Sequence, residues 1–305
     1  MEPKNIADEL ELGLVRRAAY ASVAVASLLI VIKLGAYLAT HSVALLASLI
    51  DSLLDVAASL VNLFAIRHAL VPADEEHRFG HGKAEPIAGL AQAAFIAGSA
   101  LFLIVESGNR LFHPVAIEHG ALGIAVMIIS TIGTIGLVYY QRYVIRKTGS
   151  IAIRADSLHY LGDVLVNLGI IVALVLSLYL EWYIADPLFA LGVAAYVLYN
   201  AWEIVRGSMD QLMDRELPDG ERDRIMEIAR RHPEVHGVHE LRTRTSGYVK
   251  FIQMHLEMDP LLTLRKAHQI SDEVEAEIHK VFPYSEVIIH EDPAPQEGDP
   301  GHQVP

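Results

Sequence analysis

The sequence contains no cysteine among its 305 residues. Any metal site in this chain must therefore be built from histidine, aspartate and glutamate, because no thiolate ligand is available. Basic residues are in the minority: there are 24 lysines and arginines against 37 aspartates and glutamates, and the formal net charge is −13. This balance argues against a basic face for binding nucleic acid. The chain does contain 15 histidines, so nitrogen ligands for a metal are plentiful.

The N-terminus lacks the features of a cleaved signal peptide. Residues 1–17, MEPKNIADELELGLVRR, are mixed in charge and contain neither a basic segment nor a short apolar core. We therefore expect the first apolar block to remain in the mature protein. Apolar residues make up 52% of the chain, and they gather in blocks before Arg206 and thin out after it.

Six apolar blocks are each long enough to cross a bilayer, which takes about 20 helical residues. Lysine and arginine are abundant before the first block and after the second, fourth and sixth, whereas Arg110 is almost alone on the other side. By the positive-inside rule, this asymmetry predicts that both termini are cytoplasmic. Lys33 lies deep in the first block, so it needs a polar partner or must snorkel. The predicted spans are 18–39, 43–66, 86–112, 119–140, 157–180 and 184–205.

After Arg206 the pattern becomes that of a soluble domain. Pro218 followed by acidic residues predicts the start of a helix that runs to Arg231. The segments HELRTRTSG and YVKFIQMHLEMD alternate apolar and polar residues, as half-buried strands do, and Gly247 forms the turn between them. TLRKAHQISDEVEAEIHKVF has helical periodicity with Thr263 as its N-cap, and SEVIIHED predicts a last short strand.

The predicted fold class is an α-helical membrane protein with six transmembrane helices and a small cytoplasmic α+β domain of order αββαβ. We expect the transmembrane domain to span residues 1–208 and the cytoplasmic domain to span residues 209–292. The proline-rich tail, 293–305, is expected to be disordered.

Two aspartates interrupt the second apolar block. Asp51 and Asp55 lie in SLIDSLLDVAASLVNLFAI, at a spacing that places both on one helix face. An ionised aspartate at the centre of a membrane helix costs about 2.5–3.5 kcal/mol on insertion scales, so the pair needs compensation. The fifth block carries a matching pair, His159 and Asp163, in ADSLHYLGDVLVN, and Asn167 continues the same stripe.

Two helices that each offer two ligands on one face can supply four donors to one cation. Such a tetrahedral set of nitrogen and oxygen suits Zn²⁺ and is open to other divalent ions. The bound metal would also neutralise the carboxylates. The alternative is structural, because a lone membrane aspartate can be protonated or can pair with serine or a backbone carbonyl. The two matched pairs favour a transport site.

The connection between the second and third blocks, VPADEEHRFGHGKAEP, carries a second candidate cluster. Asp74, His77 and His81 follow one another at spacings of three and four, which gathers them if the segment is helical or tightly turned. The alternative is a solvated polar loop in which Arg78 and Lys83 serve only membrane orientation.

Histidines of the soluble domain form the third candidate cluster. His239 lies in the first strand, His255 in the second and His268 on the helix. His290 and Asp292 are two residues apart on the last strand, so they face the same side of the sheet. Surface histidines are common, and the spacing alone leaves a solvated surface equally open.

At these residues the chain resembles the cation diffusion facilitator family, and its bacterial YiiP-type members in particular. The resemblance covers nearly the whole chain and includes ASLIDSLLDVAASLVN, HRFGHGKAEP, ADSLHYLGDVLVN and VIIHEDP. It implies six transmembrane helices, a metallochaperone-like cytoplasmic domain and a homodimer in the bacterial inner membrane. The implied activity is export of a divalent cation in exchange for protons. The chain is then a secondary transporter and not an enzyme, with the bilayer, cations and protons as partners and no nucleic acid.

The resemblance also implies residue roles. Lys83 and Asp214 resemble a salt bridge that locks the two protomers together near the membrane surface. Asp292 resembles a bridging ligand of a binuclear site. The implied metal sites are the transport site with Asp51, Asp55, His159 and Asp163, the loop site with Asp74, His77 and His81, and the cytoplasmic site with His239, His255, His268, His290 and Asp292.

The chain departs from its relatives at two positions. Many zinc-selective relatives carry histidine where this chain has Asp51, and the harder donor set leaves Fe²⁺, Cd²⁺ and Mn²⁺ open beside Zn²⁺, the expected cargo and regulatory ion. Glu291 stands between His290 and Asp292, where YiiP-type relatives can carry an amide. A carboxylate there would change the charge around the site or compete as a ligand.

The predicted transport site suits antiport with alternating access, because metal and protons compete for the same ligand atoms. An intramembrane metallohydrolase would need an open metal position and a general base. Four ligands and the absence of an HExxH motif argue against it. A membrane metal sensor that does not transport, and a cation channel, both stay open at the level of sequence.

Overall fold

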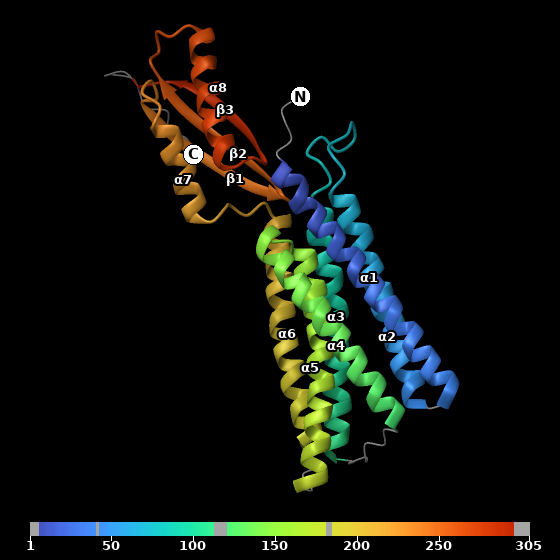
Figure 1. Ribbon diagram of the computed structural model, residues 1–305. Helices are drawn as coiled ribbons and strands as arrows, with labels where there is room; N and C mark the ends of the chain where they lie inside the picture. Colours follow the sequence, from blue (N-terminus) through green and yellow to red (C-terminus); the bar gives the residue numbers. More distant parts are fainter. Residues whose placement is uncertain (1–5, 41–42, 113–120, 181–184, 296–305) are drawn as a thin grey trace. The chain divides into compact units, whose positions relative to one another are not determined.

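The structure is a computed structural model that contains two compact units, Met1–Met209 and Asp210–Pro305. The first unit is helical and the second combines helices with a sheet, which confirms the predicted fold class (Figure 1). The described residues are 6–40, 43–112, 121–180 and 185–295.

Long helices form the described part of the first unit. They are α1 (Ile6–Thr40), α2 (Val43–Ala69), α3 (Ala84–Phe112), α4 (Ala121–Thr148), α5 (Ile151–Leu180) and α6 (Ala185–Leu212).

Each of the predicted spans falls within one of these helices, apart from a few end residues that lie outside the described ranges. By length and apolar composition, four stretches within the described residues are able to cross a membrane: Gly13–Ala39, Ser48–Ala69, Ala84–Asn109 and Pro187–Leu212. The helices α4 and α5, at 28 and 30 residues, are also long enough to cross a membrane. The helix α5 carries His159 and Asp163, the ionisable residues predicted for the transport site.

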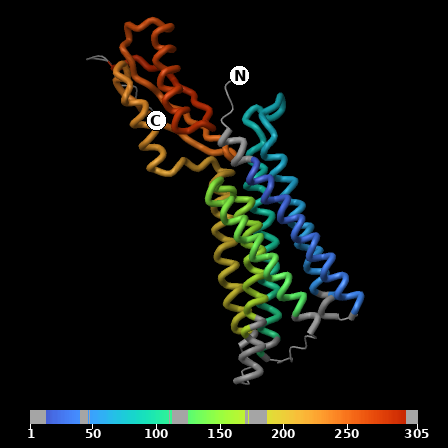
Figure 2. The backbone as a smooth tube through the Cα atoms, in the orientation of Figure 1, coloured from blue at the N-terminus to red at the C-terminus, as the bar shows by residue number. Residues whose placement is uncertain are grey.

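Small residues bring the helices of the first unit close together. One buried cluster joins Ala18 of α1, Ala88 of α3 and Ala152 of α5. Another joins Ala155 of α5 to Ala194 of α6. Close approach of helices through small side chains is typical of membrane bundles, where lipid supplies no hydrophobic drive for helices to associate. The tube view shows α1 and α2 lying side by side (Figure 2).

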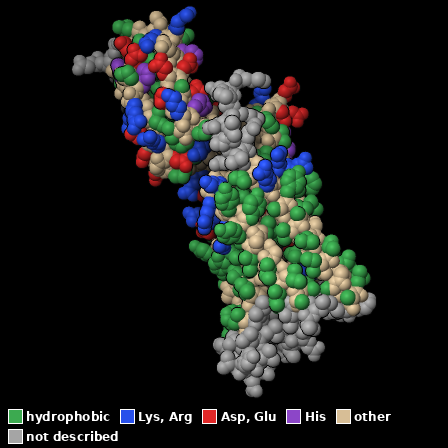
Figure 3. Space-filling view, in the orientation of Figure 1, with side chains coloured by type: hydrophobic (Ala, Val, Ile, Leu, Met, Phe, Trp, Pro, Cys, Tyr) green, Lys and Arg blue, Asp and Glu red, His purple; other side chains and the backbone are tan. Residues whose placement is uncertain are grey.

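Large apolar side chains are exposed on the described part of the first unit. Phe102 and Val105 on α3 are each 72% exposed, and Trp202 on α6 is 63% exposed. The space-filling view shows hydrophobic side chains over this unit and lysine and arginine gathered toward the end that carries the α2–α3 connection (Figure 3). An exposed apolar surface of this kind is typical of a protein that lies in a lipid bilayer. The basic end agrees with the charge asymmetry of the sequence.

The second unit has the predicted order αββαβ. Its elements are α7 (Asp219–Arg230), β1 (Gly237–Ser246), β2 (Val249–Met258), α8 (Leu264–Val281) and β3 (Ser285–Pro293). The sheet has the order β1-β2-β3, with β1 and β2 antiparallel and β2 and β3 parallel.

The ends of these elements follow from local chemistry. The Thr263 side chain accepts a hydrogen bond from the backbone N–H of Lys266, so it caps α8 as predicted. Gly247 has a φ of 60°, a left-handed conformation that glycine adopts without strain, and it forms the β1–β2 turn. Pro293, predicted to begin the tail, still belongs to β3. Residues 296–305 of the predicted tail lie outside the described residues.

Both helices of the second unit pack on one face of the sheet. Ile225 of α7 and Ile270 of α8 share a buried core with Ile252, Met254 and Leu256 of β2. Because side chains alternate along a strand, the intervening residues of β2, including His255, face the opposite side. One face of the sheet is therefore a hydrophobic core. The opposite face carries His255, and no helix packs on it among the described residues of the second unit.

Candidate metal centres

The predicted intramembrane pairs converge on one point. Ligand atoms of Asp55 on α2 and of His159 and Asp163 on α5 all lie within 4.8 Å of one another. His159 Nε2 is 2.9 Å from Asp55 Oδ1, and the two side chains are only 12% and 13% exposed. One imidazole and two carboxylates supply three ligands, which leaves one position of a tetrahedral ion open.

Asp51 and Asn167 lie outside this group. Asp51 is exposed on α2, one turn before Asp55. The Asn167 side-chain amide donates to Thr131 Oγ1 of α4 at 3.2 Å, so it joins helices rather than the cluster. The structure therefore brings together three of the four residues predicted for the transport site.

Lys33 has the polar partners that the sequence required. Its ammonium donates to Ser52 Oγ at 2.6 Å and to the Ser48 carbonyl oxygen at 3.1 Å, both on α2. Ser52 adjoins Asp51, so a positive charge lies beside the carboxylates of α2.

Asp156 is a buried carboxylate that sequence reasoning missed, although it lies in the quoted segment ADSLHYLGDVLVN. Its Oδ2 accepts hydrogen bonds from Ser22 Oγ of α1 at 2.5 Å and from Gln141 Nε2 of α4 at 2.8 Å. Asp156 and Gln141 are fully buried. One turn along α5, the Tyr160 hydroxyl bonds Ser59 of α2 at 2.7 Å. These polar contacts connect four helices behind the candidate transport site.

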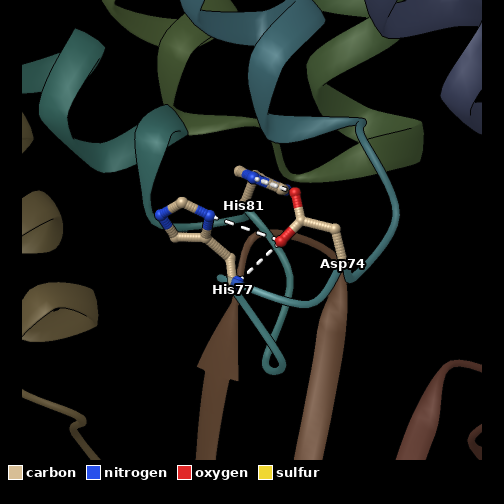
Figure 4. Close-up of side chains that lie close together, drawn as sticks. All are labelled: Asp74, His77 and His81. Carbon is tan, nitrogen blue, oxygen red and sulfur yellow. Dashed lines mark hydrogen bonds and ion pairs between the residues drawn. The ribbon is translucent and has the colours of Figure 1, made fainter.

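The loop between α2 and α3 brings together the second predicted cluster. Ligand atoms of Asp74, His77 and His81 lie within 4.8 Å of one another, and Figure 4 shows both imidazoles turned toward the Asp74 carboxylate. His77 Nδ1 is 3.5 Å from Asp74 Oδ1, and His81 Nε2 is 3.4 Å from Asp74 Oδ2. The loop is tightly turned rather than helical. Gly80, with a φ of 76°, reverses the chain between the two histidines.

Local hydrogen bonds prepare these side chains to bind a cation. Asp74 Oδ1 accepts the backbone N–H groups of His77 at 2.6 Å and Glu76 at 3.0 Å. The bond from the His77 N–H, more than any other interaction, holds the Asp74 pKa below its ordinary value. His81 Nδ1 lies 3.3 Å from the Val71 carbonyl oxygen. A carbonyl can only accept, so Nδ1 carries the proton and Nε2 keeps the lone pair that a metal needs.

The third cluster lies on the face of the sheet opposite α7 and α8. Strand register places His239 opposite His255, and His255 beside His290, so three histidines form a row across three strands. Asp292 Oδ2 lies 2.7 Å from His255 Nδ1 and 3.4 Å from His239 Nε2, while its Oδ1 lies 3.3 Å from His290 Nε2. The two oxygens of one carboxylate thus contact different histidines, as a bridging ligand would.

Two predicted members of this cluster are placed differently. The ligand atoms that group within 4.8 Å are those of His239, His255 and Asp292, and His290 stands at their edge with a side chain that is 65% exposed. His268 on α8 is 72% exposed and lies 3.8 Å from Asp272 of the same helix. In this single chain, α8 therefore does not contribute to the group.

The sequence suggested that Glu291 could compete as a ligand of the cytoplasmic cluster, but the structure turns its side chain away from that cluster. Glu291 accepts a hydrogen bond from Ser271 Oγ of α8 at 3.0 Å, on the face of the sheet opposite His290 and Asp292. The carboxylates that do flank the cluster are others. Glu257 Oε1 lies 3.4 Å from His239 Nε2, and Glu240 Oε2 lies 3.8 Å from His255 Nε2. Glu257 is two residues after His255 on β2, so strand alternation could have predicted that it faces the cluster. The position of Glu240 could not be predicted in this way, because the strand pairing is irregular between His239 and Arg242.

Comparison with known proteins decides the family. Residues 19–213 match the family described as cation efflux transmembrane domain, and residues 217–294 match the cation efflux protein, cytoplasmic domain. The chain belongs to the cation diffusion facilitator family. The proposed resemblance is therefore confirmed.

Members of the cation diffusion facilitator family from Salmonella are similar along almost the entire chain. Proteins named cation-efflux pump FieF from Salmonella newport (strain SL254) and Salmonella enteritidis PT4 (strain P125109) are 52% identical over 288 residues. These alignments cover 93% of this chain and 96% of each relative.

Two solved structures that are similar to this chain each cover about a quarter of it. The zinc form of the putative zinc transporter CzrB is 30% identical and covers 27% of this chain and 93% of its own, with a TM-score of 0.26. The metal-bound C-terminal domain of the CzcD transporter from Thermotoga maritima is 30% identical and covers 26% of this chain and 98% of its own, with a TM-score of 0.25.

The dimer lock expected for a cation diffusion facilitator stays a prediction for this chain. Lys83 belongs to the first unit and Asp214 to the second. Within the second unit, Asp214 Oδ1 accepts a hydrogen bond from Arg244 Nη1 at 3.4 Å. A lock between Lys83 and Asp214 would add to this contact.

Proposed function

We propose that this chain exports a divalent cation, chiefly Zn²⁺, from the cytoplasm in exchange for protons. The observation that carries the proposal is the convergence of Asp55, His159 and Asp163 inside the membrane-spanning unit. Ionisable groups at membrane depth mark ion pathways, because their burial is too costly to serve packing alone. Asp51, one turn from Asp55, is the proposed fourth ligand when a cation binds.

The ligand chemistry supports antiport. A cation binds only ionised carboxylates and neutral imidazole, so metal and protons compete for the same lone pairs. In the inward-facing state, at neutral pH, the site takes up metal. In the outward-facing state, an acidic exterior supplies protons that displace the metal. Because the two species bind one at a time, movement of α2 and α5 relative to the other helices exchanges one for the other.

The cytoplasmic unit is proposed to sense the exported metal as a homodimer. The two oxygens of Asp292 contact different histidines, which suits a carboxylate shared by two ions. His268 and His290 are exposed and are proposed to complete the coordination when metal binds. Metal that binds the dimer more tightly than the monomer would favour the dimer by mass action. The proposed location is the bacterial inner membrane, with both termini in the cytoplasm.

The test is metal uptake by proteoliposomes that contain a pH-sensitive dye and carry an imposed pH gradient, with Asp55→Ala as the inactive control. Zn²⁺ flux accompanied by proton movement in the opposite direction supports the proposal. Zn²⁺ flux without proton movement would leave a channel. Metal binding without any flux would leave a sensor. Parallel assays with Fe²⁺, Cd²⁺ and Mn²⁺ rank these ions against Zn²⁺ as cargo.

A further inference from the structure

A fourth histidine contacts the loop cluster from outside the loop. His68 lies in the last turn of α2, and its ring packs edge-on against the ring of His81, with 4.6 Å between centroids and 65° between planes. The centroid of the His77 ring lies 4.5 Å from that of the His81 ring. His81 therefore stands between two other imidazoles, one from the loop and one from the membrane helix.

The loop alone offers three ligands. Asp74, His77 and His81 provide one carboxylate and two imidazoles, all from a segment of eight residues. A zinc ion in a closed site takes four ligands in a tetrahedron. Three ligands of the loop would leave one position to water, unless another side chain reaches it.

His68 is able to reach that position. Its side chain is exposed, and among the described residues neither of its ring nitrogens makes a hydrogen bond or an ion pair. Its nitrogens are not among the atoms that group within 4.8 Å. The ring is nevertheless in contact with His81, and rotation about its side-chain bonds between staggered rotamers redirects a nitrogen without moving the helix.

We propose that His68 is the fourth ligand of the loop site, so that the bound metal has three imidazoles and the Asp74 carboxylate. The metal would then join α2 to the loop rather than close the loop on itself. His68 lies 13 residues after Asp55 on α2, or roughly 20 Å along the helix. Metal at the loop site would thus restrain the cytoplasmic end of the helix that carries a transport ligand. The inference rests on the proposed metal binding at the loop but not on transport.

The test uses the full chain with Asp163→Ala, His239→Ala and His255→Ala, which remove ligands from the other two clusters, at limiting Zn²⁺. X-ray absorption at the zinc edge counts imidazole ligands, and competition with a chromophoric chelator measures affinity. We expect three imidazoles in this background and two after His68→Phe. Loss of a residue that hydrogen-bonds to a metal ligand costs about 10- to 100-fold in metal affinity. Loss of a ligand itself should therefore lower the affinity for Zn²⁺ by at least about 10-fold.

His68→Phe is the matched variant, because phenylalanine retains a ring to pack against His81 but has no lone pair to donate. His68→Ala should lower affinity to the same extent, and Arg67→Ala, an exposed neighbour on the same turn, should leave both readouts unchanged. Two imidazoles in the background protein, or full affinity in His68→Phe, would overturn the proposal.

One further variant separates this inference from the loop site itself. If Asp74→Ala abolishes Zn²⁺ binding while His68→Phe does not, the loop site stands and the role of His68 fails. If Asp74→Ala has no effect, or the background protein binds no Zn²⁺, both the loop site and the role of His68 fail. Zinc-dependent protection of α2 from hydrogen exchange near its C-terminal end should also disappear in His68→Phe.

Discussion

His159 Nε2 lies 2.9 Å from Asp55 Oδ1, although the two residues are 104 positions apart in the chain. The contact joins α5 to α2 inside the helical unit, and Asp163 adds a second carboxylate from the next turn of α5. Two helices thus bring their ionisable residues to one point, which is the proposed transport site. The same contact provides the sharpest tests of the proposed transport site.

Asp163→Ala should abolish metal flux in proteoliposomes while the protein remains folded and dimeric by size-exclusion chromatography. The reason is the loss of one of three clustered ligands. Asn167→Ala is the matched control, since Asn167 lies one turn further on α5 but bonds Thr131 of α4. It should retain flux within about two-fold. Full transport by Asp163→Ala would remove this residue from the site.

Asp51→His should raise the preference for Zn²⁺ over Mn²⁺ and Fe²⁺. Imidazole is a softer donor than carboxylate, and Asp51 is one helical turn from Asp55. Competition between metal ions in the flux assay measures the rank order. Asp51→Asn, which keeps an oxygen donor, should not produce the same shift. An unchanged rank order in Asp51→His would mean that residue 51 is not a ligand.

Lys33→Met should strengthen cation binding at the transport site. The Lys33 ammonium bonds Ser52, which adjoins Asp51, and a positive charge near a dication opposes its entry. We expect a lower dissociation constant for Zn²⁺, by roughly a few-fold, from titration of the full chain in detergent. Lys33→Arg retains the charge and should bind as the wild type does. Weaker binding in Lys33→Met would show that Lys33 supports the site instead.

Asp292→Ala should remove zinc-dependent strengthening of the dimer, because its two oxygens contact three histidines. Glu291→Gln is the matched control from the adjacent position, since Glu291 bonds Ser271 on the other face of the sheet. Sedimentation velocity of the full chain in detergent, with and without Zn²⁺, measures both. The bridging role would be rejected if zinc strengthens the Asp292→Ala dimer as it does the wild type.

Asp156→Leu should destabilise the helical unit, because Ser22 and Gln141 lose a shared acceptor in a buried environment. Ser22 keeps its bond to the Ala18 carbonyl and Gln141 its bond to Ser22, so the expected cost is that of lost hydrogen bonds, about 1 kcal/mol each. Asp156→Asn retains an acceptor oxygen and should lose less. Thermal unfolding in detergent compares the two variants. Equal stability of Asp156→Leu and the wild type would show that the polar contacts do not hold the four helices together.

The sequence alone predicted the helices of the first unit and the order of elements in the second. Apolar blocks of membrane-spanning length predicted the helices of the first unit, and the change to alternating patterns after Arg206 predicted the αββαβ order. Both signals are local, since they depend on the period of apolar residues along a single element. Strand alternation could also have predicted that Glu291 faces away from His290 and Asp292, because adjacent residues of a strand face opposite sides.

Tertiary structure decided which distant residues meet. The polar partners of Lys33, the buried contacts of Asp156 and the position of His68 beside His81 all join separate segments of the chain. Spacing within one helix places residues on a face but does not say which helix packs there, or in what rotation. Those choices are made by close packing of small residues such as Ala18 and Ala152, and the polar side chains meet where that packing brings them.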